Sequence, residues 1–458
     1  MCIHKEPSSF RDRSGFVFEC ADTIYRQIQP SYFPQYRHLM DSGLYSALVA
    51  KRLIIPHKEA QPKGHDAAGG LVLQPKRVPY ISYPYEWCFE QYKDAALATL
   101  AIHLTALEYG MILKDASAYN IQFLSGYAVL IDTCSFDFYK EGMPWVAYGQ
   151  FCRHFLAPLL LMSKVDQRAA KLMQSFIDGI PLDMASAMLK GKRVGGFAWQ
   201  HIILHARMIE RHAQDGKRSG KQVTISKAAF ASIARSLQSG VARIKPRNIQ
   251  TEWGEYYAHT NYSGAAQVAK KELVARFLER AGTLKHVWDF GANDGTYSKL
   301  AVELGAHVVA FDIDAVAVER NYLEARRTHE SMLPLVLDLT APSPAIGFAN
   351  RERGTIDQRQ KPDCIMMLAV IHHLTISNNL PFQELVRWLS GICRFLILEF
   401  VPKADSQVRL LLKTRVDIFE DYDAEHLESA FGEAFDLLEK QPVPDSERIL
   451  YLFRKHTD

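Results

Sequence analysis

The sequence predicts an α/β protein of two domains, the second of which is an open, mostly parallel sheet flanked by helices. The 458-residue chain is too long for one hydrophobic core. Along its second half, short β-branched runs alternate with helical periods, which is typical of βαβ units. Between Gly216 and Gln250 there are eight Lys or Arg and no acid, with Ser-Gly and Pro breaks. We expect the boundary there, between domains over 1–245 and 246–458.

Composition and charge exclude several classes of protein. Apolar residues make up 48% of the chain and charged residues 23%, which is ordinary for a globular protein. The net charge of +3 gives no specific nucleic-acid signal. No run of 18 apolar residues and no signal-peptide core occur, so we expect a cytoplasmic protein without a membrane span. The seven scattered cysteines contain no CxxC, which predicts reduced thiols and no zinc site.

The first domain is predicted to mix strands and helices. A helix is expected over Gly43–Ile55, a strand, turn and second strand over Leu71–Trp87, and a helix over Tyr92–Tyr109. Further helices are expected over 144–212. Three histidines fall on one face of the last of these helices, and we expect them to pack rather than to bind metal: His201, His205 and His212.

Within this domain, the stretch MILKDASAYNIQFLSGYAVLIDTCSFDF carries a pattern of acids. Asp115 and Asn120 stand five positions apart, and a hairpin (121–124 and 128–131) then leads to Asp132. The pattern resembles the catalytic loop and metal-binding aspartate of the kinase and aminoglycoside-phosphotransferase superfamily. The resemblance implies that Asp115 orients an acceptor hydroxyl, and that Asn120 and Asp132 hold magnesium on a nucleotide.

Departures from that family limit the prediction. A glycine-rich phosphate loop and a strand lysine are not visible upstream, and Thr-Cys follows Asp132. We therefore expect a degenerate kinase-like α+β module with at most a vestigial magnesium site. Two alternatives stay open, namely an active phosphotransferase and a hairpin whose acids only cap turns.

The second domain is organised around KHVWDFGANDGTYSKLAVELGAHVVAFDID, one βαβ unit. Asp289 ends the first strand, and Gly291 and Gly295 allow a sharp turn that brings the backbone close to a ligand. Asp312 ends the second strand, where a carboxylate can accept both hydroxyls of a ribose. Asn293 stands where a dinucleotide-binding G-x-G-x-x-G would need glycine.

This D-x-G-x-N-D-G turn resembles motif I of class I S-adenosylmethionine (SAM) methyltransferases, and VVAFDID resembles their motif II. The resemblance implies a Rossmann-like seven-stranded methyltransferase sheet with SAM as cofactor. It implies that Asp289, Gly291, Asn293 and Gly295 lie at the methionine end and that Asp312 binds the ribose. It also implies that Asp338 and Leu339 flank the adenine. A helix over Gly264–Arg280 is expected to close the pocket, with Tyr262 a candidate for its lining.

The remaining strands are expected over 335–339, 363–370 and 394–400, followed by an antiparallel pair over 434–439 and 448–453. All five parallel strands would then end in polar residues at one edge of the sheet, where ligands bind in such folds. The fourth strand runs into A-V-I-H-H-L rather than the amide-methylating signature N-P-P-Y. His372 or His373 could act as a general base, or the pair could pack and shape the pocket.

The whole chain resembles bacterial two-module methyltransferases that include NoeA-type nodulation proteins, on the segments LKDASAYNIQF, PWVAYGQFC and HFLAPLLLM. Enzymes that cap surface polysaccharides carry similar modules in the other order. Both resemblances favour a glycan or glycolipid intermediate as the substrate, and neither fixes an acceptor. We expect transfer of the methyl group to oxygen of a small-molecule or glycan-type acceptor. The alternatives are a bifunctional methyltransferase and kinase acting on a surface glycan or glycolipid, and a non-catalytic partner protein that binds SAM or a nucleotide. The oligomeric state cannot be predicted.

Overall fold

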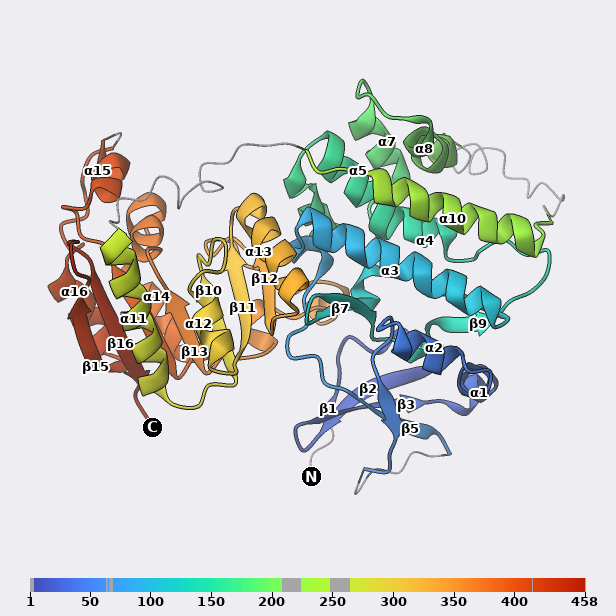
Figure 1. Cartoon of the computed structure of the whole chain (residues 1–458), viewed down its shortest axis with the longest axis horizontal. Helices are drawn as coiled ribbons and strands as arrows, with labels where there is room; N and C mark the ends of the chain where they lie inside the picture. The colour runs from blue at the N-terminus through green and yellow to red at the C-terminus, as the bar shows by residue number, and fades with distance from the viewer. Residues whose placement is uncertain are drawn as a thin grey trace. The chain divides into compact units, whose positions relative to one another are not determined.

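The computed structural model describes residues 4–62, 65, 69–207, 224–247, 264–413 and 415–457 (Figure 1). The chain forms two compact units, Met1–Asn248 with Pro344–Gly354, and Ile249–Ser343 with Thr355–Asp458. Pro344–Gly354, which the sequence places in the second domain, therefore belongs to the first unit. Its Glu352 is 3% exposed and forms an ion pair with Arg11, which explains this assignment.

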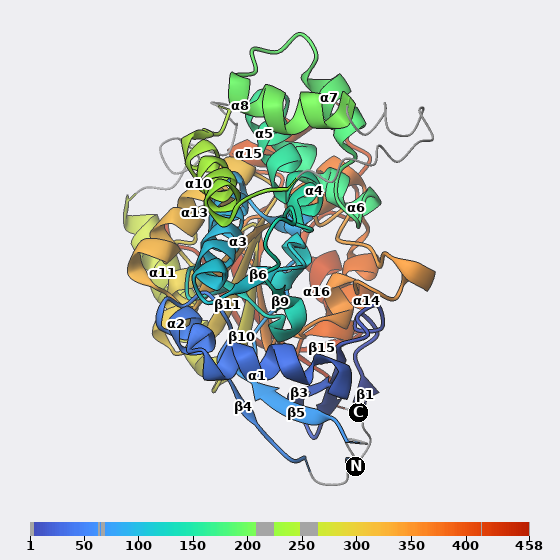
Figure 2. The ribbon, with the colours of Figure 1, turned by 90° about the vertical axis from the view of Figure 1, so that its right-hand side faces the viewer.

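Unit 1 begins with an antiparallel five-stranded sheet in the order β1-β2-β3-β5-β4. Figure 2 shows these strands in blue, with α1 beside them, and Ile28 and Leu73 of the sheet pack against Tyr32 and Tyr36. The elements are β1 (His4–Lys5), β2 (Gly15–Cys20), β3 (Thr23–Ile28), η1 (Pro30–Tyr32), α1 (Phe33–Asp41), α2 (Leu44–Ala50), β4 (His57–Glu59) and β5 (Leu71–Pro75).

Two expectations for this region are wrong. The helix expected over Gly43–Ile55 ends at Ala50, because Arg52 adopts a left-handed φ of 56° and Ile54 bridges to Leu130. The second strand expected within Leu71–Trp87 is absent from the described structure, and the chain there forms a single 3-10 turn, η2 (Pro84–Glu86). The prolines of this segment explain the difference, since they cannot donate to a strand ladder.

The predicted hairpin of unit 1 is confirmed. β7 (Ile121–Leu124) pairs with β8 (Tyr127–Leu130), and the turn residues Ser125 and Gly126 both have positive φ. On either side of the hairpin, β6 (Met111–Leu113) pairs antiparallel with β9 (Phe136–Phe138). Short 3-10 turns, η3 (Ala118–Asn120) and η4 (Thr133–Ser135), join these strands and carry the sequence-predicted polar residues.

Helices make up the rest of unit 1. The basic run predicted as an interdomain joint contains a 17-residue helix, α10 (Lys227–Arg243), whose buried Phe230, Ala234 and Leu237 follow helical spacing. α10 lies along α3 (Phe89–Glu108) (Figures 1 and 2). The other elements are α4 (Tyr148–Phe151), η5 (Cys152–Leu156), α5 (Ala157–Lys164), η6 (Gln167–Lys171), α6 (Leu172–Ser175), α7 (Leu182–Leu189), α8 (Gly196–Ala198) and η7 (Trp199–Leu204).

Unit 2 is built on a sheet in the order β12-β11-β10-β13-β14-β16-β15. The first five strands in this order are parallel, and β16 runs antiparallel between β14 and β15. This order confirms the predicted Rossmann-like fold. The strands are β10 (His286–Phe290), β11 (His307–Asp312), β12 (Met332–Val336), β13 (Cys364–Met367), β14 (Phe395–Phe400), β15 (Phe435–Pro442) and β16 (Ile449–Lys455).

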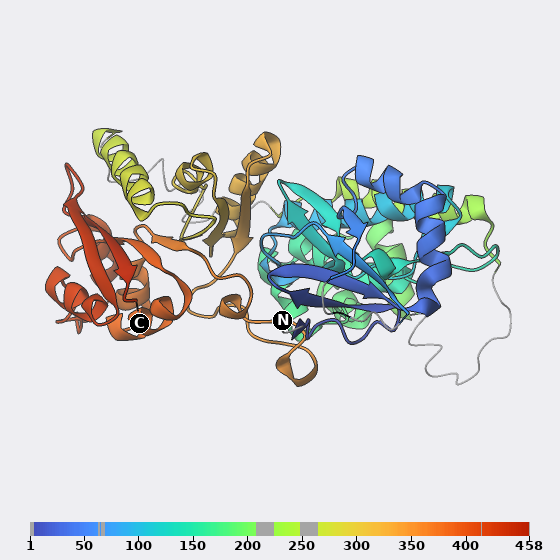
Figure 3. The same ribbon diagram turned by 90° about the horizontal axis from the view of Figure 1, so that it is seen from below.

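Helices cover both faces of this sheet. In Figure 3 the yellow helices α11, α12 and α13 lie on one face, and the orange and red helices α14 and α16 lie on the other. The alternation along β10 explains the two layers: Val287 joins the core under α11, whereas Phe290 stacks on Trp388 of α14. The elements are α11 (Gly264–Ala281), α12 (Ser298–Glu303), α13 (Ala315–Thr328), η9 (Phe348–Asn350), η10 (Ile356–Gln358), η11 (His373–Ser377), α14 (Phe382–Ile392), α15 (Ser406–Leu412) and α16 (Ala424–Gly432), of which η9 is counted with unit 1.

In the part of the chain that the structure describes, none of the helices combines the length and apolar character needed to cross a bilayer.

Candidate active site

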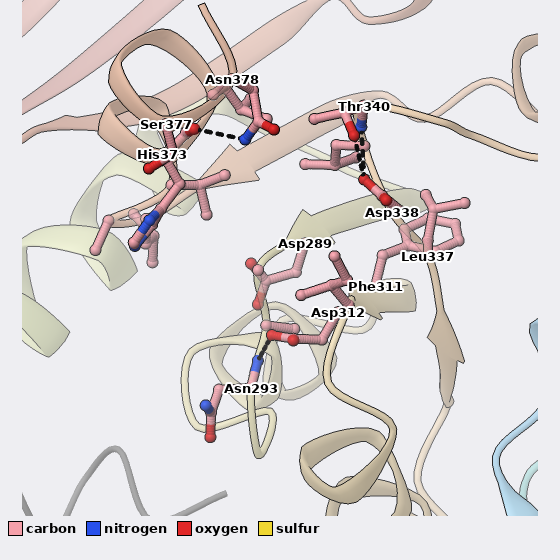
Figure 4. A pocket seen from close by; sticks show the side chains of 18 of the residues that line it. Asp289, Asn293, Phe311, Asp312, Leu337, Asp338, Thr340, His373, Ser377 and Asn378 are labelled. Carbon is pink, nitrogen blue, oxygen red and sulfur yellow. Dashed lines mark hydrogen bonds between the residues drawn. The ribbon is translucent and has the colours of Figure 1, made fainter. Parts of the chain in front are cut away.

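A cavity of about 290 Å³ opens at the carboxyl edge of the unit 2 sheet (Figure 4). It lies where the chain leaves β10, β11, β12 and β13. Seven sequence-predicted residues line it: Asp289, Gly291, Asn293, Asp312, Asp338, Leu339 and His373. Gly295 and His372 are not among its lining residues, and Tyr262 lies outside the described residues.

Asp289 forms the buried end of this cavity. It is 2% exposed, and its Oδ2 accepts a hydrogen bond of 2.6 Å from the Ser298 hydroxyl. Burial, and after it the nearby Asp312, raise the pKa of Asp289 to about 7 against the opposing effects of Ser298 and Lys270. Figure 4 shows the carboxyls of Asp289 and Asp312 close together. A cationic group placed between them would favour the ionised form of both.

Asp312 links two loops. Its Oδ2 accepts from the backbone N–H of Asn293 at 2.8 Å, and its Oδ1 accepts from that of Asp314 at 2.8 Å. Burial raises the pKa of Asp312 to about 6, although both backbone donors oppose the shift. The carboxylate is thus held in one orientation, and each oxygen keeps lone-pair capacity for a ligand hydroxyl.

The turn after β10 requires glycine for two different reasons. Gly291 has φ +76°, and a Cβ there would lie 2.2 Å from Val370, whose side chain also lines the cavity. Gly295 has φ +79°, and a Cβ there would lie 2.6 Å from the buried side-chain amide of Asn321. The absence of a side chain at Gly291 therefore leaves room in the cavity, whereas its absence at Gly295 lets the turn pack against α13.

Asp338 follows the third strand less closely than expected. β12 ends at Val336, so Asp338 lies in the following turn, where its Oδ1 accepts from the backbone and hydroxyl of Thr340. The expected strand over 335–339 is therefore shifted towards the N-terminus. Asp338 and Leu339 still line the cavity, and Figure 4 shows Asp338 beside Thr340.

The two adjacent histidines differ in their position relative to the cavity. His373 lines the cavity, and Figure 4 shows it on the opposite side from Asp338. His372 is 2% exposed, and its ring centroid lies 4.1 Å from that of His373. Burial lowers the pKa of both imidazoles, and that of His372 falls well below its ordinary value. A neutral His373 can therefore accept a proton from a group in the cavity.

Sequence analysis missed Lys270, a lining residue contributed by α11. Its Nζ lies 2.6 Å from Glu399 Oε2 and 4.7 Å from the centroid of the Tyr297 ring. Glu399 is fully buried at the end of β14, and Arg448 lies 3.7 Å from its other oxygen. Arg448 also pairs with Asp405 at 2.8 Å, so two cations face two carboxylates here. Burial lowers the pKa of Lys270, and Glu399 opposes that shift. The adjacent Lys270-Lys271 pair reads in the sequence as a solvated face, so no local signal identifies Lys270.

The polar residues predicted in unit 1 also come together. Asp115 Oδ2 accepts from the Asn120 amide at 3.0 Å, and Asp115 Oδ1 accepts from Gln150 at 2.7 Å. Burial raises the pKa of Asp115, and the neighbouring Asp132 raises it further. The structure thus places Asp115, Asn120 and Asp132 near one another, and the kinase-like assignment of the module stays a prediction.

Arg26 of β3, which the sequence analysis overlooked, forms an ion pair of 2.6 Å with Asp132 Oδ1. Asp132 Oδ2 accepts from the Ser135 hydroxyl at 2.5 Å. A magnesium ion at Asp132 would have to displace the guanidinium or share its oxygen with it, which disfavours metal binding. In the described part of the chain, one group of three side chains could hold a metal ion, namely Asp12, Asp132 and Cys134, and it includes the same carboxylate.

Two of the three histidines singled out in the sequence pack around one tyrosine. His201 Nδ1 lies 2.7 Å from the Tyr148 hydroxyl, and the His205 ring centroid lies 5.1 Å from the Tyr148 ring. His212 lies outside the described residues.

Comparisons with known proteins give one relative along nearly the whole chain. The nodulation protein NoeA of Rhizobium meliloti (strain 1021) is 33% identical over 456 residues, which cover 98% of this chain and 95% of the relative. No family model matches the chain.

Among solved structures, N-methyltransferase NodS from Bradyrhizobium japonicum WM9 aligns with a TM-score of 0.31 at 13% identity, covering 43% of this chain and 99% of NodS. Magnesium protoporphyrin IX methyltransferase from Synechocystis PCC 6803, with bound SAH, aligns with a TM-score of 0.31 at 18% identity, covering 44% of this chain and 93% of that one.

Proposed function

This chain belongs to the family of the nodulation protein NoeA, and from the cavity of unit 2 we propose that it is a SAM-dependent methyltransferase. The observation that carries the proposal is the convergence of Asp289, Asp312 and Asp338 on one cavity at the carboxyl edge of a Rossmann-like sheet. Such an edge is where open α/β sheets bind nucleoside-containing ligands.

The donor set fits the three parts of SAM. Asp312 offers oxygens of fixed orientation to the two ribose hydroxyls, and Asp338 with Leu339 provides an acceptor and an apolar surface for the adenine. Asp289 and Lys270 lie at the remaining side of the cavity with opposite charges, which suits the ammonium and carboxylate of an amino-acid end. When bound, SAM would supply a methyl group already activated on a sulfonium.

With an activated methyl group, the protein has to align the acceptor and, for a hydroxyl acceptor, remove its proton. His373 is the residue that we assign to this proton transfer, since it lines the cavity and burial keeps its imidazole neutral. We assign His372, whose ring contacts that of His373, as a positioning residue. This assignment underlies our proposal of methylation on oxygen, with a small-molecule or glycan-type acceptor.

A second candidate function concerns unit 1, where Asp115, Asn120 and Asp132 gather around the hairpin. This grouping favours descent from a kinase-like module and supports, at most, a weak magnesium–nucleotide site. The ion pair between Arg26 and Asp132 argues against phosphotransfer and therefore against a bifunctional enzyme.

Binding and turnover together test the proposal. Calorimetry with SAM and with S-adenosylhomocysteine (SAH) should give one site per chain, and mass spectrometry of the purified protein should detect either molecule when it co-purifies. Methylation is then read as the mass gain of one methylene on hydroxyl-bearing glycan acceptors. Failure of both SAM and SAH to bind would overturn the proposal. Binding without transfer to any acceptor would favour the non-catalytic partner protein.

A further inference from the structure

A second cavity lies in unit 1, apart from the polar residues around the hairpin. Its volume is about 450 Å³, and four parts of the unit enclose it: α3, the start of α4 with the segment before it, the π-helix η7, and α10 with Ile225, two residues before it. It shares no lining residue with the group around Asp115 and Asp132. The residues that line it are His103, Pro144, Trp145, Tyr148, Gln200, His201, Ile225, Phe230, Ser232, Ile233, Ala234 and Ser236.

This cavity has a buried floor and an exposed rim. His103, Trp145, His201, Phe230 and Ala234 are buried. The rim is formed by exposed lining residues with both polar and apolar side chains, namely Pro144, Gln200, Ser232, Ile233 and Ser236. A molecule of small size can therefore enter from solvent and reach groups that are themselves withdrawn from water.

Two of the lining histidines each have a buried ring nitrogen without a hydrogen-bond partner among the described residues. His103 is fully buried, and its Nδ1 accepts from the backbone N–H of Leu113 at 3.3 Å. Burial lowers the pKa of His103 to about 3, so the neutral ring carries its proton on Nε2. His103 Nε2 and His201 Nε2 have no hydrogen-bond partner among the described residues. A ligand acceptor that reached His103 Nε2 would complete the hydrogen bonding of a buried donor.

The walls are aromatic and uncharged. Trp145 stacks on His103 with ring centroids 4.0 Å apart, and Phe230 lies 5.3 Å from the same ring. No Asp, Glu, Lys or Arg is among the residues that line the cavity within the described chain. Nucleotides, carboxylates and cations would bury an unpaired charge here, so the lining disfavours them. A polyhydroxyl sugar would leave most of its hydroxyls against apolar walls.

We propose that this cavity binds a small, neutral heteroaromatic molecule whose ring nitrogen or carbonyl oxygen accepts a hydrogen bond from His103. The aromatic floor supplies flat contact area, and His201 with its Tyr148 partner supplies a second hydrogen-bonding position. This site is independent of the unit 2 cavity and does not rest on methyltransferase activity.

Ligand-observed NMR tests the site with matched probes. Nicotinamide and adenine represent neutral rings, and nicotinate and AMP are their anionic counterparts. The protein is used at full length and saturated with SAH, so that adenine cannot report on the unit 2 cavity. Should SAH not bind, the neutral-ring binding is assigned by the variants below alone. We expect the neutral rings to bind at least tenfold more tightly than their anionic counterparts.

Two exposed serines of α10 provide a blocking variant and its control. Ser236→Trp places an indole at the mouth of the cavity, whereas Ser239→Trp makes the same change at an exposed position of α10 that does not line it. Binding should weaken at least tenfold in the first variant and stay unchanged in the second. His103→Phe keeps the aromatic packing and should also weaken binding.

Three outcomes would overturn the proposal: no binding of either neutral ring at millimolar concentration, binding that Ser236→Trp leaves intact, or equal binding of nicotinate and nicotinamide. Tight binding of zinc or glucose instead, abolished in Ser236→Trp, would reject the heteroaromatic class and identify the cavity as a metal or sugar site.

Discussion

Asp312 is the residue whose geometry is most specific in the unit 2 cavity. Replacing it with alanine removes two acceptor oxygens and also frees the backbone N–H groups of Asn293 and Asp314. The loss of charge-assisted hydrogen bonds costs about 2–4 kcal/mol, so SAH affinity should fall at least tenfold. Calorimetry measures this fall. Asp312→Asn, which keeps one oxygen, should lie between wild type and Asp312→Ala. Unchanged affinity in both variants would remove the ribose assignment.

The two buried carboxyls predict a pH dependence of binding. Burial raises the pKa of Asp289 to about 7 and that of Asp312 to about 6. Below these values the carboxyls of the unliganded protein are protonated, and they must lose their protons before they can accept hydrogen bonds from SAM as carboxylates. Affinity for SAM should therefore be constant at alkaline pH and fall as the pH drops through about 7, by up to about tenfold per unit for each carboxyl below its pKa. Calorimetry between about pH 5.5 and 8.5 gives the profile. Asp312→Asn should bind more weakly but with a shallower slope. A flat profile for the wild type would contradict the role of both carboxyls.

Experiments on single variants can distinguish the role of His373 from that of His372. His373→Ala should lower turnover on the order of a hundredfold and leave SAM affinity within about threefold, because its imidazole acts on the acceptor. His372→Ala removes a buried ring and should instead lower the free energy of unfolding by about 1–3 kcal/mol. Rates with a hydroxyl acceptor and thermal unfolding of both variants separate the two effects. Equal, small losses of rate in both variants would assign the pair to packing.

Single residues were predictable where a local pattern places them. Asp289 is the last residue but one of an apolar strand pattern and Asp312 is the last residue of the next, so their place near the sheet edge follows from the local pattern. Lys270 and Arg26 carry no such pattern, since each meets its carboxylate partner across more than a hundred residues of chain. Their roles depend on tertiary packing.

Among the elements, the turn between β10 and α12 offers a test of backbone geometry. Gly295→Ala combines a left-handed φ with a contact on Asn321 and should destabilise unit 2 by about 2–4 kcal/mol. Gly305 has φ +89°, but a Cβ there would meet no atom within 4 Å, so Gly305→Ala should cost only about 1 kcal/mol. Thermal unfolding compares the variants, and SAH affinity should fall only for Gly295→Ala. Equal losses of unfolding free energy in the two variants would show that Asn321 moves away from the added methyl group without a measurable cost.

Elements with a strong period were predictable, and elements defined by long-range pairing were not. The helix expected over Gly264–Arg280 is α11, and the hairpin of β7 and β8 follows its Ser-Gly turn. The β2–β3 hairpin was not predicted, because its two-residue turn, Ala21-Asp22, lacks glycine although both residues adopt positive φ. Ala369, which lines the unit 2 cavity, likewise adopts a positive φ of 56° although it is not a glycine.

At the scale of the whole molecule, the two units are not two continuous halves of the sequence. Pro344–Gly354 reads as a polar loop between strands of the second domain, yet it belongs to unit 1. The Arg353 guanidinium lies 4.4 Å from the centroid of the Tyr119 ring, and the Gly354 N–H donates to the Tyr83 hydroxyl. These partners are more than 200 positions away in sequence, so local patterns carry no signal of the arrangement.

Unit 1 as a whole is expected to lack phosphotransfer activity. We expect no transfer or hydrolysis of ATP or GTP at a useful rate, because Arg26 occupies the Asp132 oxygen that a magnesium ion would need. Phosphoryl transfer depends almost entirely on positioning and charge neutralisation, so a site without metal and phosphate loop loses most of its rate. Phosphate release and thermal shift are measured with magnesium and each nucleotide on wild type, Asp132→Asn and the exposed control Asp183→Asn. Turnover that disappears only in Asp132→Asn would make the bifunctional enzyme the better interpretation. Stabilisation without turnover would indicate a nucleotide-binding pseudokinase, and no response in any variant would leave the hairpin acids as turn caps of a scaffold.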